Sequence, residues 1–424
     1  MRIHTVQPND TIFSIADAYN IPLTRLLKDN NLPQNYTLSI GQSLIITNPV
    51  ITYIVQEGDT LSRIATAYEV SELQLMRNNP QLLDRDYLYL GEELVISYDH
   101  LQTIQVNGYA FSNITTKVLR QSLPFLTYLT IINYRVTADG TIVDVNDTEI
   151  IEMAKSYRVA PVMMISSITE DGVGSFGTNH AILINPGVQE NLIQNLLAIL
   201  NAKGLYGVNL GFQSILNEDI PLYIDFVTKV TTNLNSAGYQ VFVTLVPSTY
   251  GYISGINMEI PYFTQIGQAT NYAILMSYQW STEFMPTVAQ TTVNFLSNYL
   301  GYVMNRIPVE KLFLGLTRIA YDWELPYVEG QTIGTALTNV DALNLANQTG
   351  AVINYDETTQ TPYFNYNTTG VEHFVWFKDA RSIKAIVDLV VENDLKGISV
   401  WNVMYYAPQT WLIINTQYEI ENVI

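Results

Sequence analysis

Residues 204–215 read GLYGVNLGFQSI, and small or polar residues alternate there with Val208, Leu210 and Phe212. A period of two residues is that of a β-strand, and this stretch follows a long helical pattern that ends in a glycine. The stretch is therefore expected to be one strand of a sheet whose strands alternate with helices.

Seven further apolar runs continue this pattern after about residue 103. The eight expected strands are 104–112, 128–136, 159–166, 206–212, 240–246, 272–278, 311–317 and 396–403. Helical patterns lie between most of them, at 188–202, 219–236, 286–304 and 379–393. Such alternation favours the α/β class and a (β/α)8 TIM barrel over residues 103–424. Residues 321–377 are too long for a simple crossover and are expected to form an α+β insertion beside a cleft.

The first hundred residues contain one small unit twice. TVQPNDTIFSIADAYNI at 5–21 matches IVQEGDTLSRIATAYEV at 54–70, and the match extends to a shared pattern around Gly41 and Gly91. Each copy reads strand, helix, short helix, strand, which predicts two small βααβ domains at 1–48 and 52–98. Asp10 and Asp59 stand where the first helix of each copy opens, and they are expected to cap it.

Both copies resemble LysM domains, whose pattern V-x-x-G-D-T-L-x-x-I-A-x-x-Y is nearly complete in the second copy. The first copy has Asn9 where the second has Gly58, and asparagine also tolerates a positive φ. The resemblance implies that each copy binds N-acetylglucosamine (GlcNAc) polymers, such as peptidoglycan or chitin, in a shallow groove. The implied groove residues are Asn9, Asp10, Thr11, Ile12, Asn30 and Leu32, and then Gly58, Asp59, Thr60, Leu61, Asn79 and Leu82.

Composition excludes several partners. The 20 basic and 39 acidic residues give a net charge of −19, which repels nucleic acid and anionic lipid surfaces. The sequence has no apolar run long enough to insert into a membrane and no signal-peptide pattern, so synthesis in the cytosol or mother cell is expected. Cysteine is absent and the four histidines are scattered, so no metal and no cofactor are expected.

Charged residues make up only 14% of the chain, against roughly 25% in typical soluble domains. An uncharged polar surface is weakly protected against self-association, so a homo-oligomer or an ordered assembly is expected. The LysM resemblance, together with the resemblance of the barrel region given next, implies a location at a spore surface, coat or exosporium, or at the cell wall.

The barrel region resembles the chitinase-type family 18 glycoside hydrolases, especially sporulation-associated N-acetylglucosaminidases with two N-terminal LysM domains. The resemblance covers the whole chain and includes YDWELPY at 321–327, MSYQW at 276–280 and GISVW at 397–401. The stretch 204–215 aligns with the family signature D-G-x-N-x-D-x-E, whose three acidic positions fall on Tyr206, Gly211 and Gln213.

In this family the signature Glu protonates the glycosidic oxygen while the acetamide of the substrate attacks the anomeric carbon. Gln213 has no proton to donate, and Gln279 replaces a further family Asp. The prediction is therefore that no residue is catalytic, and that Tyr206 faces the barrel mouth in space left by the substrate. The predicted vestigial site consists of Tyr206, Asn209, Gly211, Gln213, Tyr278, Gln279 and Trp401.

Tyr278 and Trp401 either keep a sugar-binding surface or simply fill the top of the barrel. The preferred hypothesis is a non-catalytic, glycan-binding pseudo-glycosidase, and it is compatible with a structural protein that assembles on a spore or cell surface. The alternative is an active family 18 N-acetylglucosaminidase that acts on spore cortex peptidoglycan or chitin.

Overall fold

The structure is a computed structural model that describes the chain except residues 34, 86, 169–173, 213–214, 246–261, 277–292 and 329–330 and the side chain of Phe295. Its first two units are the predicted βααβ repeats. The first comprises β1 (Arg2–Thr5), α1 (Ile12–Ala18), α2 (Leu23–Asp29) and β2 (Ser43–Ile46). The second comprises β3 (Ile51–Ile54), α3 (Leu61–Ala67), α4 (Glu72–Asn78), the 3-10 helix η1 (Pro80–Asp84) and β4 (Glu93–Ser97).

Threonine, rather than aspartate, caps the first helix of each repeat. Thr11 and Thr60 each accept a hydrogen bond from the backbone N–H three residues further on. Asp10 and Asp59 instead accept, at 2.7 Å, the backbone N–H of the residue three positions before them. The expectation that the aspartates cap the helices is therefore wrong, because their carboxylates close the turn that follows the first strand.

The predicted eight-stranded parallel barrel is confirmed. Its strands follow the order β5-β6-β8-β9-β10-β11-β12-β18, and β5 pairs with both β6 and β18, which closes the sheet. They are β5 (Gln102–Ala110), β6 (Tyr128–Val136), β8 (Ala160–Ser166), β9 (Gly207–Leu210), β10 (Gln240–Leu245), β11 (Tyr272–Leu275), β12 (Leu312–Thr317) and β18 (Gly397–Trp401).

Helices cover the outside of the barrel, as the apolar periodicity requires. They are α5 (Thr116–Ser122), η2 (Leu123–Phe125), α6 (Thr148–Ser156), α7 (Phe176–Leu183), α8 (Pro186–Lys203), η3 (Asn217–Asp219), α9 (Ile220–Ser236), α10 (Phe263–Ala269), α11 (Val293–Met304), η4 (Val309–Lys311), α13 (Ala380–Glu392) and α14 (Pro408–Gln417). Two short strands, β7 (Ile142–Val143) and β19 (Tyr418–Ile420), extend the sheet beyond the barrel.

The insertion between β12 and β18 is a lobe of one antiparallel sheet with a helix. The sheet order is β14-β13-β17-β16-β15. The elements are β13 (Ile319–Leu325), β14 (Thr335–Thr338), α12 (Asn339–Thr349), β15 (Asn354–Asp356), β16 (Thr361–Thr368) and β17 (Val371–Trp376). Ala320, Phe364 and Val375 point from one face of this sheet and pack against α12, so the lobe has a core of its own.

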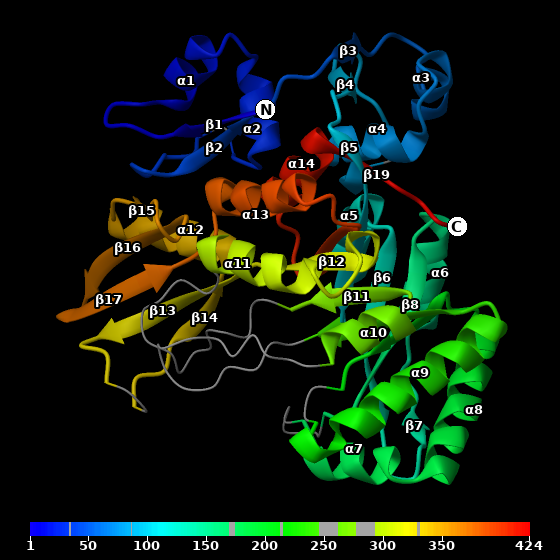
Figure 1. Ribbon diagram of the computed structural model, residues 1–424. Helices are drawn as coiled ribbons and strands as arrows, with labels where there is room; N and C mark the ends of the chain where they lie inside the picture. The colour runs from blue at the N-terminus through cyan, green and yellow to red at the C-terminus, as the bar shows by residue number, and fades with distance from the viewer. Residues whose placement is uncertain are drawn as a thin grey trace.

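The two repeats lie side by side over α13 and α14 of the barrel, and the lobe projects to one side (Figure 1). In the second repeat, the buried Arg77 guanidinium donates to the carbonyl of Ile420 at 3.0 Å and to Oδ1 of Asn422 at 3.2 Å. In the first repeat, Ser43 Oγ accepts the N–H of Ala380 at 3.2 Å. Buried bonds of this kind attach both repeats to the barrel.

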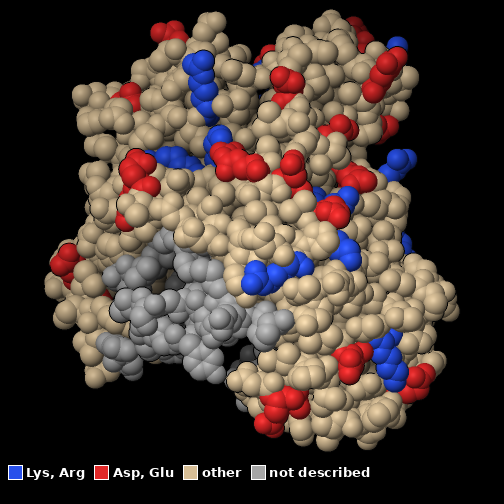
Figure 2. Space-filling view, in the orientation of Figure 1, with Lys and Arg blue, Asp and Glu red and all other residues tan. Residues whose placement is uncertain are grey.

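Charged side chains are scattered over the visible face, and most of that face is uncharged (Figure 2). No helix in the described part of the chain is both long enough and apolar enough to cross a membrane. The described residues also contain no group of three His, Asp or Glu side chains that would hold a metal ion.

Candidate active site

The barrel interior contains a hydrogen-bonded layer of uncharged side chains. Asn209 of β9 donates from Nδ2 to the hydroxyl of Tyr109 at 3.0 Å and accepts at Oδ1 from Thr244 at 2.9 Å. Asn107 donates to Ser399 Oγ at 2.8 Å. Burial raises the pKa of Tyr109 to about 12, so its phenol stays neutral. This layer therefore offers hydrogen bonds but no carboxylate.

Gly211 follows the end of β9, and the space for a side chain there is taken. A Cβ atom at this position would lie 2.3 Å from Cε of Met164 and 3.0 Å from the carbonyl oxygen of Ile165. The Met164 methyl is the end of a flexible side chain, whereas the carbonyl is fixed in β8. An aspartate at Gly211 would therefore require the Met164 side chain to move.

Trp401 ends β18, where it pairs in register with Thr317 of β12. Its half-buried ring lies 5.1 Å from the ring of Tyr109 and 6.3 Å from that of Phe111. Because Tyr109 also bonds to Asn209, the indole borders the uncharged polar layer. An aromatic surface at the carboxyl ends of the strands is the part of a TIM barrel where ligands are bound.

Tyr206 does not face the barrel mouth, so that prediction is wrong. It precedes Gly207, the first residue of β9, and therefore lies at the amino-terminal end of the barrel strands. Its ring is 5.6 Å from that of Tyr128, which in turn lies 5.1 Å from Phe242. Burial raises the pKa of Tyr206. Tyr206 thus packs in the aromatic floor of the barrel, opposite to the mouth.

Three predicted site residues, Gln213, Tyr278 and Gln279, lie outside the described residues. Of the predicted barrel site, the structure brings together Asn209, Gly211 and Trp401 near the carboxyl ends of the strands and places Tyr206 at the other end.

A histidine–carboxylate pair follows two neighbouring barrel strands at their carboxyl ends. His180 lies in α7, which follows β8, and Asp219 ends η3, which follows β9. Both Asp219 oxygens lie 2.9 Å from Nδ1 of His180. The Asp219 side chain is 3% exposed, whereas that of His180 is 41% exposed. The buried carboxylate thus orients an imidazole whose Nε2 has no described hydrogen-bond partner. Sequence analysis missed this pair because the residues are 39 positions apart.

A second pair lies in the lobe. Asp322 accepts from Tyr366 at 2.6 Å, and Nδ1 of His373 lies 3.1 Å from its other oxygen. The Tyr366 ring stacks on the imidazole with 4.6 Å between centroids. Asp322 belongs to β13 and His373 to β17, so this pair lies on the antiparallel sheet of the lobe and not on a barrel strand.

In the LysM-like grooves, the exposed residues come from the loop between the first strand and the first helix. Asn9, Thr11, Gly58 and Thr60 are exposed, and Asp10, Asp59, Leu32 and Leu61 are partly exposed. Ile12 and Leu82 are each 5% exposed and belong to the cores of their repeats. Asn9 and Gly58 have φ angles of 73° and 80°, so the substitution between them preserves a left-handed turn.

Asn30 and Asn79 are buried and fully hydrogen-bonded within their repeats. Asn79 Nδ2 donates to the carbonyls of Leu75 at 2.9 Å and Val95 at 2.7 Å, and its Oδ1 accepts the N–H of Val95 at 2.8 Å. Asn30 makes the same three bonds to Leu26 and Ile45. These side chains tie the second helix of each repeat to its closing strand.

Comparison with known families matches residues 87–405 to the glycosyl hydrolases family 18, and residues 4–47 and 53–97 to the LysM domain. A cortical fragment-lytic enzyme of Bacillus anthracis is 31% identical over 98% of this chain and 97% of its own length. A putative sporulation-specific glycosylase of Bacillus subtilis, YdhD, is 27% identical over 97% of this chain and 98% of its own.

A crystal structure of the Bacillus cereus spore cortex-lytic enzyme SleL superposes with a TM-score of 0.81 at 30% identity. The superposition covers 99% of each chain. These relatives are named as enzymes, and they resemble this chain from end to end. The prediction that the chain is a non-catalytic protein and not an enzyme is therefore wrong. The physical reason for the error is that it relied on the charges at four aligned positions alone.

Proposed function

Because the chain belongs to the glycosyl hydrolases family 18 and carries two LysM domains, we propose that it is an N-acetylglucosaminidase that acts on spore cortex peptidoglycan or a related GlcNAc polymer. The observation that carries the proposal is similarity over the full length, repeats and barrel together, to enzymes named for spore cortex lysis. In this proposal the LysM domains and the barrel, two separate domain types, both act on the same GlcNAc-containing glycan.

In this proposal the repeats hold the glycan and the barrel cleaves it. The exposed loop residues Asn9, Thr11, Gly58 and Thr60 contact sugar, while Asn30 and Asn79 support the grooves from inside. Trp401 supports one sugar ring at the barrel mouth, and the uncharged layer below it offers hydrogen bonds to the acetamide.

A proton donor is still required, since Gly211 and Gln213 are uncharged. We propose His180, oriented by the buried Asp219, as that donor. The imidazolium gives its proton to the glycosidic oxygen as the C1–O bond breaks, and the acetamide oxygen of the substrate forms a bond to C1. Water then opens the cyclic intermediate and returns a proton to the imidazole. General acid catalysis of this kind increases a reaction rate by ~10²–10⁴-fold.

The experiment measures how fast variants of two histidine–aspartate pairs release reducing GlcNAc ends from cortex fragments. His180→Gln and Asp219→Asn are expected to lower kcat by ~10²-fold or more. The controls His373→Gln and Asp322→Asn remove an equivalent pair in the lobe and are expected to retain kcat within a few-fold. Equal losses in both pairs, or unchanged kcat in the first pair, would contradict the assignment of His180.

The spore association of the relatives supports a spore-associated location for this chain as well. We also propose that copies associate with one another, since 14% charged residues leave few like charges to keep surfaces apart. A glycan-degrading enzyme that gathers on an insoluble wall would benefit from the several glycan grooves that such an assembly presents.

A further inference from the structure

The segment 402–405 begins directly after Trp401, and one buried side chain holds both of its ends. Arg318 is the first residue after β12, and it has no exposed surface. Its Nη2 donates to the carbonyl of Asn402 and, at 3.1 Å, to the carbonyl of Tyr405. The Tyr405 hydroxyl donates in return to the carbonyl of Arg318. Arg318 therefore fixes the start and the end of the segment that follows Trp401.

The middle of this segment is bonded to the end of β5. The N–H of Val403 donates to the carbonyl of Tyr109 at 2.8 Å, and the N–H of Phe111 donates to the sulfur of Met404 at 3.3 Å. The Trp401 ring lies 5.1 Å and 6.3 Å from the rings of the same two aromatic residues. The backbone that follows Trp401 is thus held at three places, and this restricts the direction of the indole.

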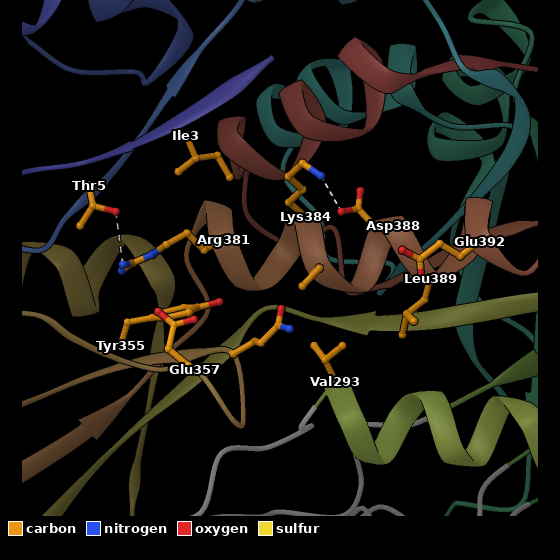
Figure 3. A pocket seen from close by; sticks show the side chains of 12 residues that line it. Ile3, Thr5, Val293, Tyr355, Glu357, Arg381, Lys384, Asp388, Leu389 and Glu392 are labelled. Carbon is orange, nitrogen blue, oxygen red and sulfur yellow. Dashed lines mark hydrogen bonds and ion pairs between the residues drawn. The ribbon is translucent and has the colours of Figure 1, made fainter.

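Arg318 is surrounded by carbonyl oxygens and aromatic rings, and it forms no ion pair with a described residue. Its guanidinium carbon lies 4.5 Å from the ring centroid of Tyr405 and 5.5 Å from that of Trp411, within the range of cation–π contacts. Figure 3 shows a contrasting, partly exposed ion pair on α13, where Lys384 lies 2.5 Å from Asp388 beside a cavity of about 480 Å³. The planar guanidinium of Arg318 instead directs its hydrogen bonds at backbone carbonyls.

Trp411 gives Arg318 a rigid support. It is fully buried in α14 and stacks on Phe125 with 5.4 Å between ring centroids and 11° between ring planes. The same helix is bonded to the second repeat, where Asn415 Nδ2 donates to Oδ1 of Asn78 at 2.8 Å. A side chain that is itself held by close packing can hold a neighbouring segment in a precise position.

We propose that Arg318 is a positioning residue, which bonds to the segment 402–405 and so holds the Trp401 indole where it supports a sugar ring at the barrel mouth. Because Arg318 is fully buried, it touches no substrate and acts only through Trp401. The sugar-supporting role of Trp401 rests on the proposed function, whereas the control of its orientation rests on the contacts of Arg318.

This role predicts an effect on sugar binding and not on bond cleavage. His180, the proposed proton donor, follows β8, which is a neighbour of neither β12 nor β18 in the barrel. Loss of Arg318 therefore leaves the proton donor in place and disturbs only the sugar support. A change that removes binding shared by the ground state and the transition state raises KM and leaves kcat unchanged.

The first measurement is the fluorine NMR spectrum of the full chain with 5-fluorotryptophan in place of tryptophan. Trp401→Phe identifies the signal of residue 401. Without sugar, this signal is expected to shift or broaden in Arg318→Met, because the ring moves relative to Tyr109 and Phe111. Arg318→Lys keeps the charge but lacks the planar guanidinium, so a smaller change is expected. Tyr405→Phe removes only the bond to the Arg318 carbonyl and is also expected to change the signal.

The second measurement is binding of a sulfur-linked GlcNAc dimer, which resists hydrolysis, followed at the Trp401 signal. Arg318→Met is expected to weaken this binding ~10-fold, on the order of the energy of one aromatic contact. With a GlcNAc tetramer as substrate, KM is expected to rise by the same factor while kcat stays within a few-fold. The control is Arg77→Met, since Arg77 is also buried and donates to the carbonyl of Ile420, away from Trp401. This variant is expected to retain the signal, the affinity and KM.

Thermal midpoints show which variants are folded, and Arg318→Lys and Tyr405→Phe decide the question if Arg318→Met does not fold. An unchanged Trp401 signal or an unchanged dimer affinity in the folded Arg318 variants overturns the proposal, and so does an equal change in Arg77→Met. A ~10²-fold loss of kcat with an unchanged KM also overturns it, because the loss places Arg318 in the cleavage step. If the unmodified chain binds the dimer but cleaves no tetramer, the proposed function fails, and the signal and the affinity still decide the role of Arg318.

Discussion

At the scale of single residues, the described layer around Asn209 in the barrel is uncharged and closely packed, whereas some charged side chains are buried elsewhere. Gly211 leaves room only for the Met164 methyl, and Asn209 bonds to a neutral phenol. Elsewhere Asp29, in the first repeat, is 9% exposed and accepts from Thr47 Oγ1 at 2.6 Å. Burial raises the pKa of Asp29 to about 6 in spite of the nearby Arg25. Such a group makes stability depend on pH.

Asp29→Asn is expected to stabilise the protein at neutral pH. With its pKa raised from 3.8 to about 6, folded Asp29 keeps a proton that the unfolded chain releases, so stability falls as the pH rises through this window. The amide keeps an acceptor for Thr47 and has no proton to lose. The thermal midpoint of Asp29→Asn should therefore exceed that of the unmodified chain by an amount that grows between pH 4 and pH 6 and then stays constant.

The control is Asp17→Asn, at an exposed aspartate of the same repeat, which should follow the pH profile of the unmodified chain. If Asp29→Asn also follows that profile, the buried carboxylate does not couple folding to pH.

At the scale of elements, each repeat is held together by one asparagine between its second helix and its closing strand. In the second repeat Asn79 joins α4 to β4 by three hydrogen bonds. The loop residues that the LysM resemblance assigns to glycan lie at a different place, between β3 and α3. The structure thus gives Asn79 a supporting role, whereas glycan contact belongs, in our proposal, to the loop residues, although the LysM resemblance implies both kinds of residue together.

Asn79→Ala is expected to loosen the second repeat by about 2 kcal/mol or more, because it leaves buried backbone groups unsatisfied. Hydrogen exchange at residues 93–97 should accelerate accordingly in the full chain. Thr60→Ala, which removes a helix cap, should cost about 1 kcal/mol and accelerate exchange less. If Asn79→Ala leaves exchange unchanged but abolishes retention on insoluble peptidoglycan, Asn79 is a glycan ligand and not a structural support.

Elements were more predictable from sequence than the site. All eight barrel strands and both repeats follow from apolar periodicity and internal repetition, with errors of a few residues at their ends. The expected strand 206–212 is Gly207–Leu210 in the structure, and Tyr206 lies at the barrel floor because it stands at the amino-terminal end of this strand. His180 and Asp219 lie in contact because β8 and β9 are neighbouring strands of the barrel. The spacing of residues along the sequence does not reveal which strands are neighbours.

At the scale of the whole molecule, the repeats are fixed to the barrel through buried polar contacts. Arg77 bonds to the C-terminal segment, and its burial lowers the pKa of its guanidinium to about 10. The loop of the first repeat pairs with the lobe, where the N–H of Ile353 donates to the carbonyl of Ile40 at 2.9 Å. The two repeats, the lobe and the barrel are therefore joined by polar contacts, an arrangement that suits the proposed binding of one polymer.

The central claim, that this chain is a glycosidase of GlcNAc polymers, is tested most directly by incubating the unmodified full-length protein with purified spore cortex fragments. New reducing ends are then labelled and identified by mass spectrometry. The account predicts time-dependent release of fragments that end in GlcNAc, with retained anomeric configuration because the acetamide of the substrate acts as the nucleophile. Fragments that remain unchanged relative to an enzyme-free blank after prolonged incubation would contradict it.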